Sequence, residues 1–355
     1  NQIVLAAPTG RAAKRMSEIT GKKASTIHSL LEMDFKIGKF KRNKQNPICC
    51  DLLIIDEASM IDTQLMYNLL KAVPDDARII LIGDIDQLPS IGPGNVLKDL
   101  IASERISVTE LKKIFRQGAG SLIVTNAHRI NQGQFPDISY HPRSDFQFIE
   151  KEDPQDVIDT IVNLIGNQLP KAYRFHRFDD IQVLSPMKRG LIGSENLNVV
   201  LQQKLNPSPT ALHRMGRSFQ IGDKVMQIRN NYEKEVYNGD VGKITEIDLT
   251  EQTLKVVFDL KIISYDFTQI DELILAYAVS IHKYQGSECP CIIIPIHTSH
   301  FKMLDRNLLY TGLTRGKKRV VFVGTKKALA IAVKNEDVLR RYTRLKQIIQ
   351  KLIQV

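Results

Sequence analysis

The segment Leu52-Leu-Ile-Ile-Asp-Glu57 joins a run of four apolar residues to two adjacent carboxylates. A short run that is apolar on both faces is typical of a central strand in a parallel sheet, because helices cover both sides of such a sheet. Another such strand, Arg78-Ile-Ile-Leu-Ile82, comes after residues 63–73, whose spacing predicts a helix. Strand, helix and strand at this spacing predict an open parallel α/β sheet.

Polar residues follow both predicted strands. Asp56 and Glu57 follow the first, and Gly83-Asp-Ile-Asp-Gln-Leu-Pro89 follows the second. Ligands of open α/β sheets bind outside the carboxyl ends of the strands. In a nucleotide hydrolase the first carboxylate holds Mg²⁺, usually through water, and the second polarises the attacking water. Gln87 can then hydrogen-bond the γ-phosphate or that water.

Each of these two motifs also has a purely structural interpretation. The acidic pair, with Ser59 and Asp62 after it, suits the start of the following helix. The Gly, Asp and Pro residues of the second motif suit a polar loop. Because two neighbouring strands end in such motifs, we favour a nucleotide hydrolase over both structural interpretations.

The residues before the strand at Leu52 continue the α/β pattern. Residues 3–7 form a predicted buried strand, followed by a turn at Pro8-Thr9-Gly10 and a helix that ends near Gly21. A second helix is predicted from about residue 25 to 33. Residues 35–47 alternate around a polar, basic tip and predict a small hairpin.

Residues 206–271 have a different pattern. Apolar and polar residues alternate there, and turns are predicted at Gly222-Asp223 and Asn238-Gly239. Short strands at this spacing predict a small antiparallel barrel inserted between α/β segments. Strands of the parallel type return on both sides of it, at 181–184, 291–294 and 319–323. A basic surface helix from about Val338 to Ile353 is predicted last.

Composition narrows the class of protein. The chain has 355 residues, 43% hydrophobic and 25% charged, and a net charge of +10, which favours a polyanionic partner. No apolar stretch approaches the roughly 20 residues that span a bilayer, so we expect no membrane association. The pairs Cys49-Cys50 and Cys289-x-Cys291 suit neither zinc nor a redox CxxC site. Buried free thiols in a reducing cytoplasm are expected instead.

Seven motifs in a fixed order resemble those of the RecD-like branch of superfamily 1 DNA helicases, the exodeoxyribonuclease V alpha subunit type. Any one of them is weak evidence, but their order and spacing over residues 3–324 make the resemblance specific. They are Ala7-Pro-Thr-Gly-Arg-Ala-Ala-Lys-Arg-Met16, Asp56-Glu-Ala-Ser-Met60, Gly83-Asp-Ile-Asp-Gln-Leu-Pro-Ser-Ile-Gly-Pro-Gly94, Ile114-Phe-Arg-Gln117, Ala127-His-Arg-Ile-Asn131, Tyr277-Ala-Val-Ser-Ile-His-Lys-Tyr-Gln-Gly-Ser-Glu288 and Leu309-Tyr-Thr-Gly-Leu-Thr-Arg-Gly-Lys317.

The resemblance implies an α/β fold of two RecA-like P-loop NTPase domains with ATP in the cleft between them and an inserted Src-homology-3-like barrel. It implies the domain ranges 1–104, 105–205 with 272–355, and 206–271 for the barrel. The hairpin, with Lys36, Lys39, Lys41, Arg42 and Lys44, resembles the strand-separating pin of these helicases. A solvated edge hairpin protected by lysines is nearly as good an interpretation.

The resemblance also implies roles for single residues. Asp56 would coordinate Mg²⁺, Glu57 would activate water, and Gln87 would report the state of the γ-phosphate. Arg116 and Arg315 would reach the γ-phosphate, since a guanidinium keeps its charge and grips phosphate oxygens bidentately. Taken singly, each arginine is better explained as a surface ion pair, but within the ordered set of motifs the phosphate role is favoured. Gly286 and Glu288 would face the nucleotide.

Contacts to DNA are implied in both domains. Ser, Thr and backbone amides position a strand through its phosphates without reading its sequence. Two of the residues, His28 and His282, are equally well explained as polar packing residues. The implied set is Pro8, Thr9, Arg11, Thr26 and His28 in the first domain and Ser280, His282, Lys283 and Gln285 in the second.

The phosphate-binding loop of such motors, Gly-x-x-x-x-Gly-Lys-[Ser/Thr], does not occur in the 355 residues. We expect it before the strand at Ile3, so that the first domain is truncated here and lacks a central strand and the helix after it. Without its amides and lysine the β- and γ-phosphates lose their main cradle. This chain alone is therefore expected to hydrolyse ATP poorly or not at all.

The implied function is an ATP- and Mg²⁺-dependent motor that translocates 5′-to-3′ on single-stranded DNA and unwinds duplex DNA in repair or recombination. The alternative is a non-catalytic DNA-binding subunit of a helicase–nuclease complex, which would need none of the hydrolytic residues. Outside the helicase motifs we find no cluster of carboxylates with a lysine, so a nuclease is not favoured. Both interpretations allow partner subunits of an exonuclease complex.

Overall fold

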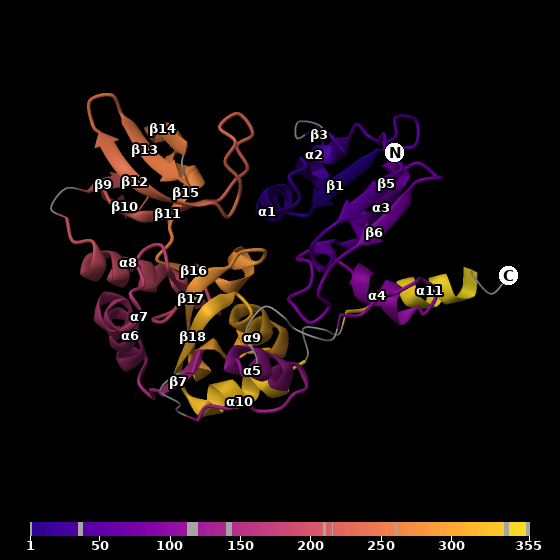
Figure 1. Cartoon of the computed structure of the whole chain (residues 1–355). Coiled ribbons are helices and arrows are strands. Elements are labelled where there is room, and N and C mark those ends of the chain that lie inside the picture. Colours follow the sequence, from indigo (N-terminus) through magenta and orange to yellow (C-terminus); the bar gives the residue numbers. More distant parts are fainter. Residues whose placement is uncertain are drawn as a thin grey trace. The chain divides into compact units, whose positions relative to one another are not determined.

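A computed structural model describes residues 2–34, 38–111, 120–139, 144–208, 211–214, 216–259, 261–336 and 341–352. The chain forms two compact units (Figure 1). The first unit contains Asn1–Ile114 and Glu336–Val355, and the second contains Phe115–Asn335. The C-terminal segment (341–352) thus belongs with the beginning of the chain.

A four-stranded parallel sheet forms the centre of the first unit, with the strand order β2-β1-β5-β6. Its strands are β1 (Ile3–Ala7), β2 (Ala24–Thr26), β5 (Leu52–Ile55) and β6 (Arg78–Leu81). Leu53 and Ile55 are fully buried, as expected for a strand covered on both faces. The predicted open parallel sheet is confirmed.

Two predicted helices in the N-terminal part of this unit are found, α1 and α3, and a third is shorter than predicted. The predicted helix 25–33 is shorter, because the chain is still in β2 at Thr26 and the Thr26 hydroxyl accepts the amide of Ser29 to begin α2. The helices are α1 (Gly10–Thr20), α2 (Ile27–Leu30), η1 (Ala58–Met60), α3 (Thr63–Ala72) and α4 (Val96–Ala102).

A five-stranded parallel sheet forms the core of the second unit, in the order β16-β8-β17-β18-β7. Both faces are covered, and β8 is buried along its whole length. The strands are β7 (Phe146–Glu150), β8 (Ile181–Ser185), β16 (Ala278–Ser280), β17 (Cys289–Ile296) and β18 (Gly316–Gly324). The helical segments are α5 (Leu122–Asn131), α6 (Pro154–Asn163), η2 (Leu164–Gln168), α7 (Leu169–Tyr173), α8 (Ser194–Leu205), η3 (Phe267–Glu272), η4 (Ile281–Tyr284), η5 (Thr298–Met303), α9 (Arg306–Leu313) and α10 (Lys326–Lys334).

The segment inserted between β8 and β16 is an antiparallel sheet with its own core around Phe219 and Tyr265. Its strand order is β14-β13-β12-β11-β15, which is open at both ends, so closure into a barrel stays a prediction. The buried Asp223 carboxylate accepts hydrogen bonds from Gln202 and Tyr277 and thereby ties the insert to the parallel sheet. The strands of this sheet are β11 (Lys224–Gln227), β12 (Val241–Asp248), β13 (Thr253–Phe258), β14 (Lys261–Asp266) and β15 (Leu273–Leu275). β9 (Leu212–Arg214) and β10 (Arg217–Phe219) pair with each other in a separate two-stranded sheet.

The last helix differs from its prediction. It is α11 (Leu345–Leu352), and it packs beside α4 in the first unit (Figure 1). The sequence prediction placed residues 272–355 together in the second domain and treated this helix as solvated. No residue of α11 is buried, so it is a surface helix as predicted. It belongs to the first unit, where the partly buried Leu345 packs against the apolar core.

The cysteines are free, as expected, but not all are buried. Cys50, Cys289 and Cys291 are buried. Cys49 is exposed, and its Sγ donates to Gln2 Oε1 at 3.0 Å. Among the described residues no helix is both long and apolar enough to cross a membrane.

Candidate functional site

The acidic pair lies at the carboxyl edge of the first sheet. The Asp56 amide still donates to the Ala6 carbonyl at 3.0 Å, and Asp56 Oδ1 accepts the Glu57 amide at 2.8 Å. Glu57 has a φ of 52° and a ψ of 38°. For a residue with a Cβ this left-handed conformation costs roughly 1–2 kcal/mol, and such strain is concentrated at functional positions. The sharp turn directs the chain away from β5 just after the two carboxylates.

The second motif packs directly on the first. The Ala58 amide donates to the Ile82 carbonyl at 2.8 Å. A Cβ on Gly83 would lie 2.9 Å from the Ser59 amide nitrogen and 2.8 Å from Leu97 Cδ2, so only glycine allows this approach. The two polar motifs predicted at neighbouring strand ends are therefore brought together.

Gln87 is held by its own loop, residues 83–94. Gln87 Nε2 donates to Asp84 Oδ2 at 3.1 Å, and Asp84 Oδ1 accepts the Asp86 amide at 3.0 Å. Leu88, the next residue, is 2% exposed and anchors the loop in the core. The Gln87 side chain is half-buried at the same sheet edge as the acidic pair.

The helix-cap interpretation of the acidic pair applies to Asp62. Its Oδ1 accepts the Leu65 amide at 2.7 Å and caps α3. Glu57 precedes η1 but makes no side-chain cap there. Capping therefore accounts for Asp62 but not for Asp56 or Glu57.

The residues at this edge suit Mg²⁺ bound mainly through water and phosphate. Among the described residues no group of three or more His, Cys, Asp or Glu side chains could enclose a metal. Mg²⁺ typically uses one or two carboxylates and keeps several waters, so Asp56 is a sufficient protein ligand. The Ser59 hydroxyl is buried without a hydrogen-bond partner in the described part of the chain, which leaves an oxygen unsatisfied beside Gly83.

The hydroxyls predicted to contact DNA in the first unit are helix caps. Thr9 Oγ1 accepts the Ala12 amide at 3.2 Å, and Thr26 is 4% exposed and caps α2. Pro8 and Arg11 are half-buried near the first of these caps. Burial lowers the pKa of His28 below its usual value, while Asp62 acts in the opposite direction. His28 also packs against the Phe40 ring, with centroids 5.8 Å apart, as its packing interpretation predicts.

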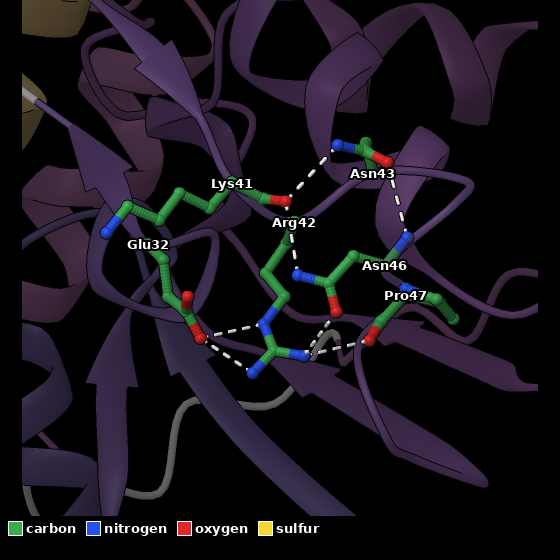
Figure 2. Close-up of polar contacts among 6 residues, drawn as sticks. All are labelled: Glu32, Lys41, Arg42, Asn43, Asn46 and Pro47. Atoms are coloured by element: carbon green, nitrogen blue, oxygen red, sulfur yellow. Dashed lines mark hydrogen bonds and ion pairs between the residues drawn. The ribbon is translucent and has the colours of Figure 1, made fainter.

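Arg42 braces the base of the predicted pin (Figure 2). Its guanidinium contacts Glu32 Oε1 at 2.6 and 2.8 Å and donates to Asn46 Oδ1 and the Pro47 carbonyl. Arg42 thus makes its contacts within the hairpin. In the described part of the hairpin, the exposed basic residues are Lys39, Lys41 and Lys44. The hairpin strands are β3 (Met33–Asp34) and β4 (Lys39–Phe40), and Lys36 lies outside the described residues.

The carboxyl edge of the second sheet carries the other predicted DNA contacts. Ser280 ends β16 and caps η4, accepting the Lys283 amide at 3.4 Å. Burial lowers the pKa of His282. The pKa of the exposed Lys283 is also lowered, first by desolvation and then by Lys188 and Arg217. Gln285 is 7% exposed.

Arg315 joins α9 to the end of the motif that contains Gly286 and Glu288. Its guanidinium is 3% exposed and donates to the carbonyls of Thr311 at 3.1 Å and Ser287 at 3.4 Å. The buried carboxylate of Glu288 lies 3.2 Å from Lys317 Nζ, a partner that motif comparison had not singled out. Gly286 turns the chain with a φ of 72°. These contacts bring the predicted nucleotide-facing residues of this unit together, except Arg116, which lies outside the described residues.

Two glycines of the Leu309–Lys317 motif lie close to neighbouring side chains. A Cβ on Gly312 would lie 2.7 Å from Ile294 Cδ1, and one on Gly316 would lie 2.3 Å from Val320 Cγ2. The close approach at Gly316 involves a branched side chain and the backbone and favours glycine, whereas the approach at Gly312 involves only the end of a flexible isoleucine side chain.

Family models match three parts of the chain. Residues 1–93 match an AAA domain, residues 197–258 match the SH3 domain of ATP-dependent RecD-like DNA helicases, and residues 275–323 match a UvrD-like helicase C-terminal domain.

Two curated proteins are similar along almost the whole chain. The ATP-dependent RecD2 DNA helicase of Deinococcus radiodurans is 34% identical over 98% of the chain and 46% of that protein. The RecBCD enzyme subunit RecD of Mycolicibacterium smegmatis is 27% identical over 95% of the chain and 64% of that protein. The chain thus spans about half to two thirds of the length of these relatives.

A solved structure shares the fold. The Pif1 helicase from Bacteroides, in complex with ADP-AlF3 and single-stranded DNA, superposes with a TM-score of 0.59 at 19% identity. The match covers 100% of the chain and 88% of that protein. This likeness confirms an α/β helicase fold.

Proposed function

The chain belongs to the RecD-like family of superfamily 1 helicases, and from this we propose that it is the motor of an ATP-dependent DNA helicase. We propose further that it translocates 5′-to-3′ along single-stranded DNA and separates duplex DNA in repair or recombination. The observation that supports this most is the packing of the acidic pair against loop 83–94 at one sheet edge.

The first unit supplies the groups for water attack on ATP. Asp56 would hold Mg²⁺, which neutralises phosphate charge when bound. Glu57 takes the proton of the attacking water, and its left-handed backbone sets the direction in which the side chain leaves the chain. Gln87 donates from its amide to the γ-phosphate or the water, and so distinguishes ATP from its products.

The second unit supplies positive charge for the developing negative charge on the phosphoryl oxygens. Arg315 and Arg116 are proposed for this role. The hydrogen bonds from Arg315 to α9 and to the Ser287 carbonyl fix its guanidinium plane. Gly286 and Glu288 line the nucleotide side of the same motif.

DNA is held at the carboxyl edges of both sheets. In the first unit the capped helix starts at Thr9 and Thr26 present backbone amides, and these rather than the hydroxyls are the proposed donors to phosphate. In the second unit Ser280, His282, Lys283 and Gln285 have the same role. The lowered pKa of His282 keeps it neutral, so its proposed contact is a hydrogen bond rather than an ion pair.

A DNA-stimulated ATPase assay tests the proposal. Because the 355 residues lack the Gly-x-x-x-x-Gly-Lys-[Ser/Thr] loop, we expect background turnover from this chain alone. A version extended upstream through that loop, called the extended version, is expected to hydrolyse ATP with strong stimulation by single-stranded DNA. Equal, robust turnover by both proteins would refute the dependence on the loop, and an inactive extended version would refute the motor.

A further inference from the structure

Arg341, in the C-terminal segment, lies against the part of loop 83–94 that follows Gln87. Its Nη1 donates to the carbonyls of Gly92 at 2.6 Å and Gly94 at 2.7 Å. Nη2 donates to the Ser90 carbonyl at 2.5 Å, and Nη1 also lies 3.2 Å from Ser90 Oγ. One guanidinium therefore holds a five-residue stretch of loop.

The guanidinium of Arg341 suits the three carbonyls of Ser90, Gly92 and Gly94 because of its charge and its planar shape. Carbonyl dipoles that point at one place repel each other unless positive charge lies between them. A guanidinium stays charged and carries five N–H donors in a fixed plane, so it can satisfy several acceptors at once. Lysine, with a compact ammonium group, cannot reproduce this geometry.

The opposite side of the loop packs against the start of α3. The Thr63 amide donates to the Pro93 carbonyl at 3.0 Å. A Cβ on Gly92 would lie 2.0 Å from Asp62 Oδ2, and one on Gly94 would lie 1.9 Å from Thr63 Oγ1. The loop is thus held between α3 and the guanidinium, and it has no room to move toward α3.

The C-terminal segment has its own attachment to the first unit. Thr343 Oγ1 donates to Asp99 Oδ2 at 2.7 Å, on the helix that follows the loop. Gln350 Nε2 lies 3.4 Å from the Ser103 carbonyl, and Leu345 packs against the core. Figure 1 shows α11 lying along α4. Arg341 is therefore presented to the loop by a docked segment rather than by a loose tail.

We propose that Arg341 is a positioning residue for Gln87, so that the nucleotide response of loop 83–94 depends on the C-terminal segment. The proposal rests on the role proposed above for Gln87. Only two residues, the buried Leu88 and then Pro89, whose ring fixes φ, separate Gln87 from the clamped stretch. This short, stiff link transmits a displacement of the stretch to Gln87.

Hydrogen exchange on the 355-residue chain tests the clamp without any need for hydrolysis. Arg341→Ala is expected to speed exchange of the amides in residues 84–94 by at least about tenfold, because bonds from a charged donor are lost. Arg341→Lys should recover only part of the protection. Arg344→Ala, which removes an exposed arginine three residues further on, is the matched control and should leave these amides unchanged. Unchanged exchange in Arg341→Ala would overturn the proposal.

Steady-state kinetics on the extended version test the positioning role. Arg341→Ala should lower kcat for ATP by about 10- to 100-fold with little change in KM, because a small displacement of a catalytic group is costly. A purely stabilising contact would lower the Tm and leave kcat unchanged well below the Tm, and that result would overturn positioning. If the unmutated extended version hydrolyses no ATP, the motor proposal fails instead, and exchange at Gln87 still decides the clamp.

Discussion

Glu57→Gln is expected to lower the kcat of DNA-stimulated ATP hydrolysis by about 10²- to 10⁴-fold in the extended version, the range for loss of a general base. The amide keeps the size and hydrogen-bonding reach of the side chain but cannot take a proton from water. The backbone at Glu57, with a φ of 52°, is equally accessible to both residues. Single-stranded DNA affinity and Tm should therefore stay unchanged, and steady-state phosphate release measures the loss.

Glu18→Gln is the matched control for this change. Glu18 is exposed on α1, so the same loss of charge there should leave turnover unaffected. Turnover in Glu57→Gln equal to that of the control would contradict the motor role. It would favour the non-catalytic DNA-binding subunit, which needs no general base.

Substitution of Arg315 is expected to slow ATP hydrolysis by the other large factor. Arginines that neutralise a transferring phosphoryl group contribute about 10³- to 10⁵-fold in rate. Lysine keeps the charge but loses the planar fork, so we expect at least about 10³-fold slower hydrolysis for Arg315→Ala and only partial recovery for Arg315→Lys. Single-turnover hydrolysis with saturating ATP measures this effect separately from binding.

The control must separate this loss from a loss of folding, because Arg315 is also a buried structural donor. Arg319, on the strand β18 that begins just after Arg315, is 7% exposed and donates to the Ser144 carbonyl at 2.8 Å and to Gln147 Oε1 at 2.7 Å. Arg319→Lys should cost similar stability and leave single-turnover hydrolysis within about threefold. Equal kinetic losses in both variants would assign Arg315 a structural role only.

The central strands of both sheets could be predicted from sequence, because buried parallel strands are continuous apolar runs such as Leu52–Ile55. The edge strands β2, β7 and β16 were not predicted. The position of Asp56 and Gln87 at one edge follows from parallel pairing alone, since such strands all end on the same side. The close packing of the two motifs was not predictable, because it depends on the missing side chain of Gly83.

Other parts of the site depend on long-range contacts that no local pattern encodes. The bonds from Arg341 to the Ser90 and Gly92 carbonyls span about 250 positions in the sequence. Basic spacing near the C-terminus predicted only a solvated helix. Likewise Arg42 was one of the basic residues assigned to a pin, and its bonds to Glu32 and Asn46 within the hairpin (Figure 2) could not be predicted.

Strand displacement by the extended version tests the motor proposal most directly. Two substrates with the same duplex, one with a 5′ single-stranded overhang and one with a 3′ overhang, are incubated with ATP and Mg²⁺. We predict ATP-dependent release of the displaced strand from the 5′-overhang substrate and none from the 3′-overhang substrate. Binding of both substrates without release of either strand would contradict the motor, and release from the 3′-overhang substrate alone would contradict the proposed direction.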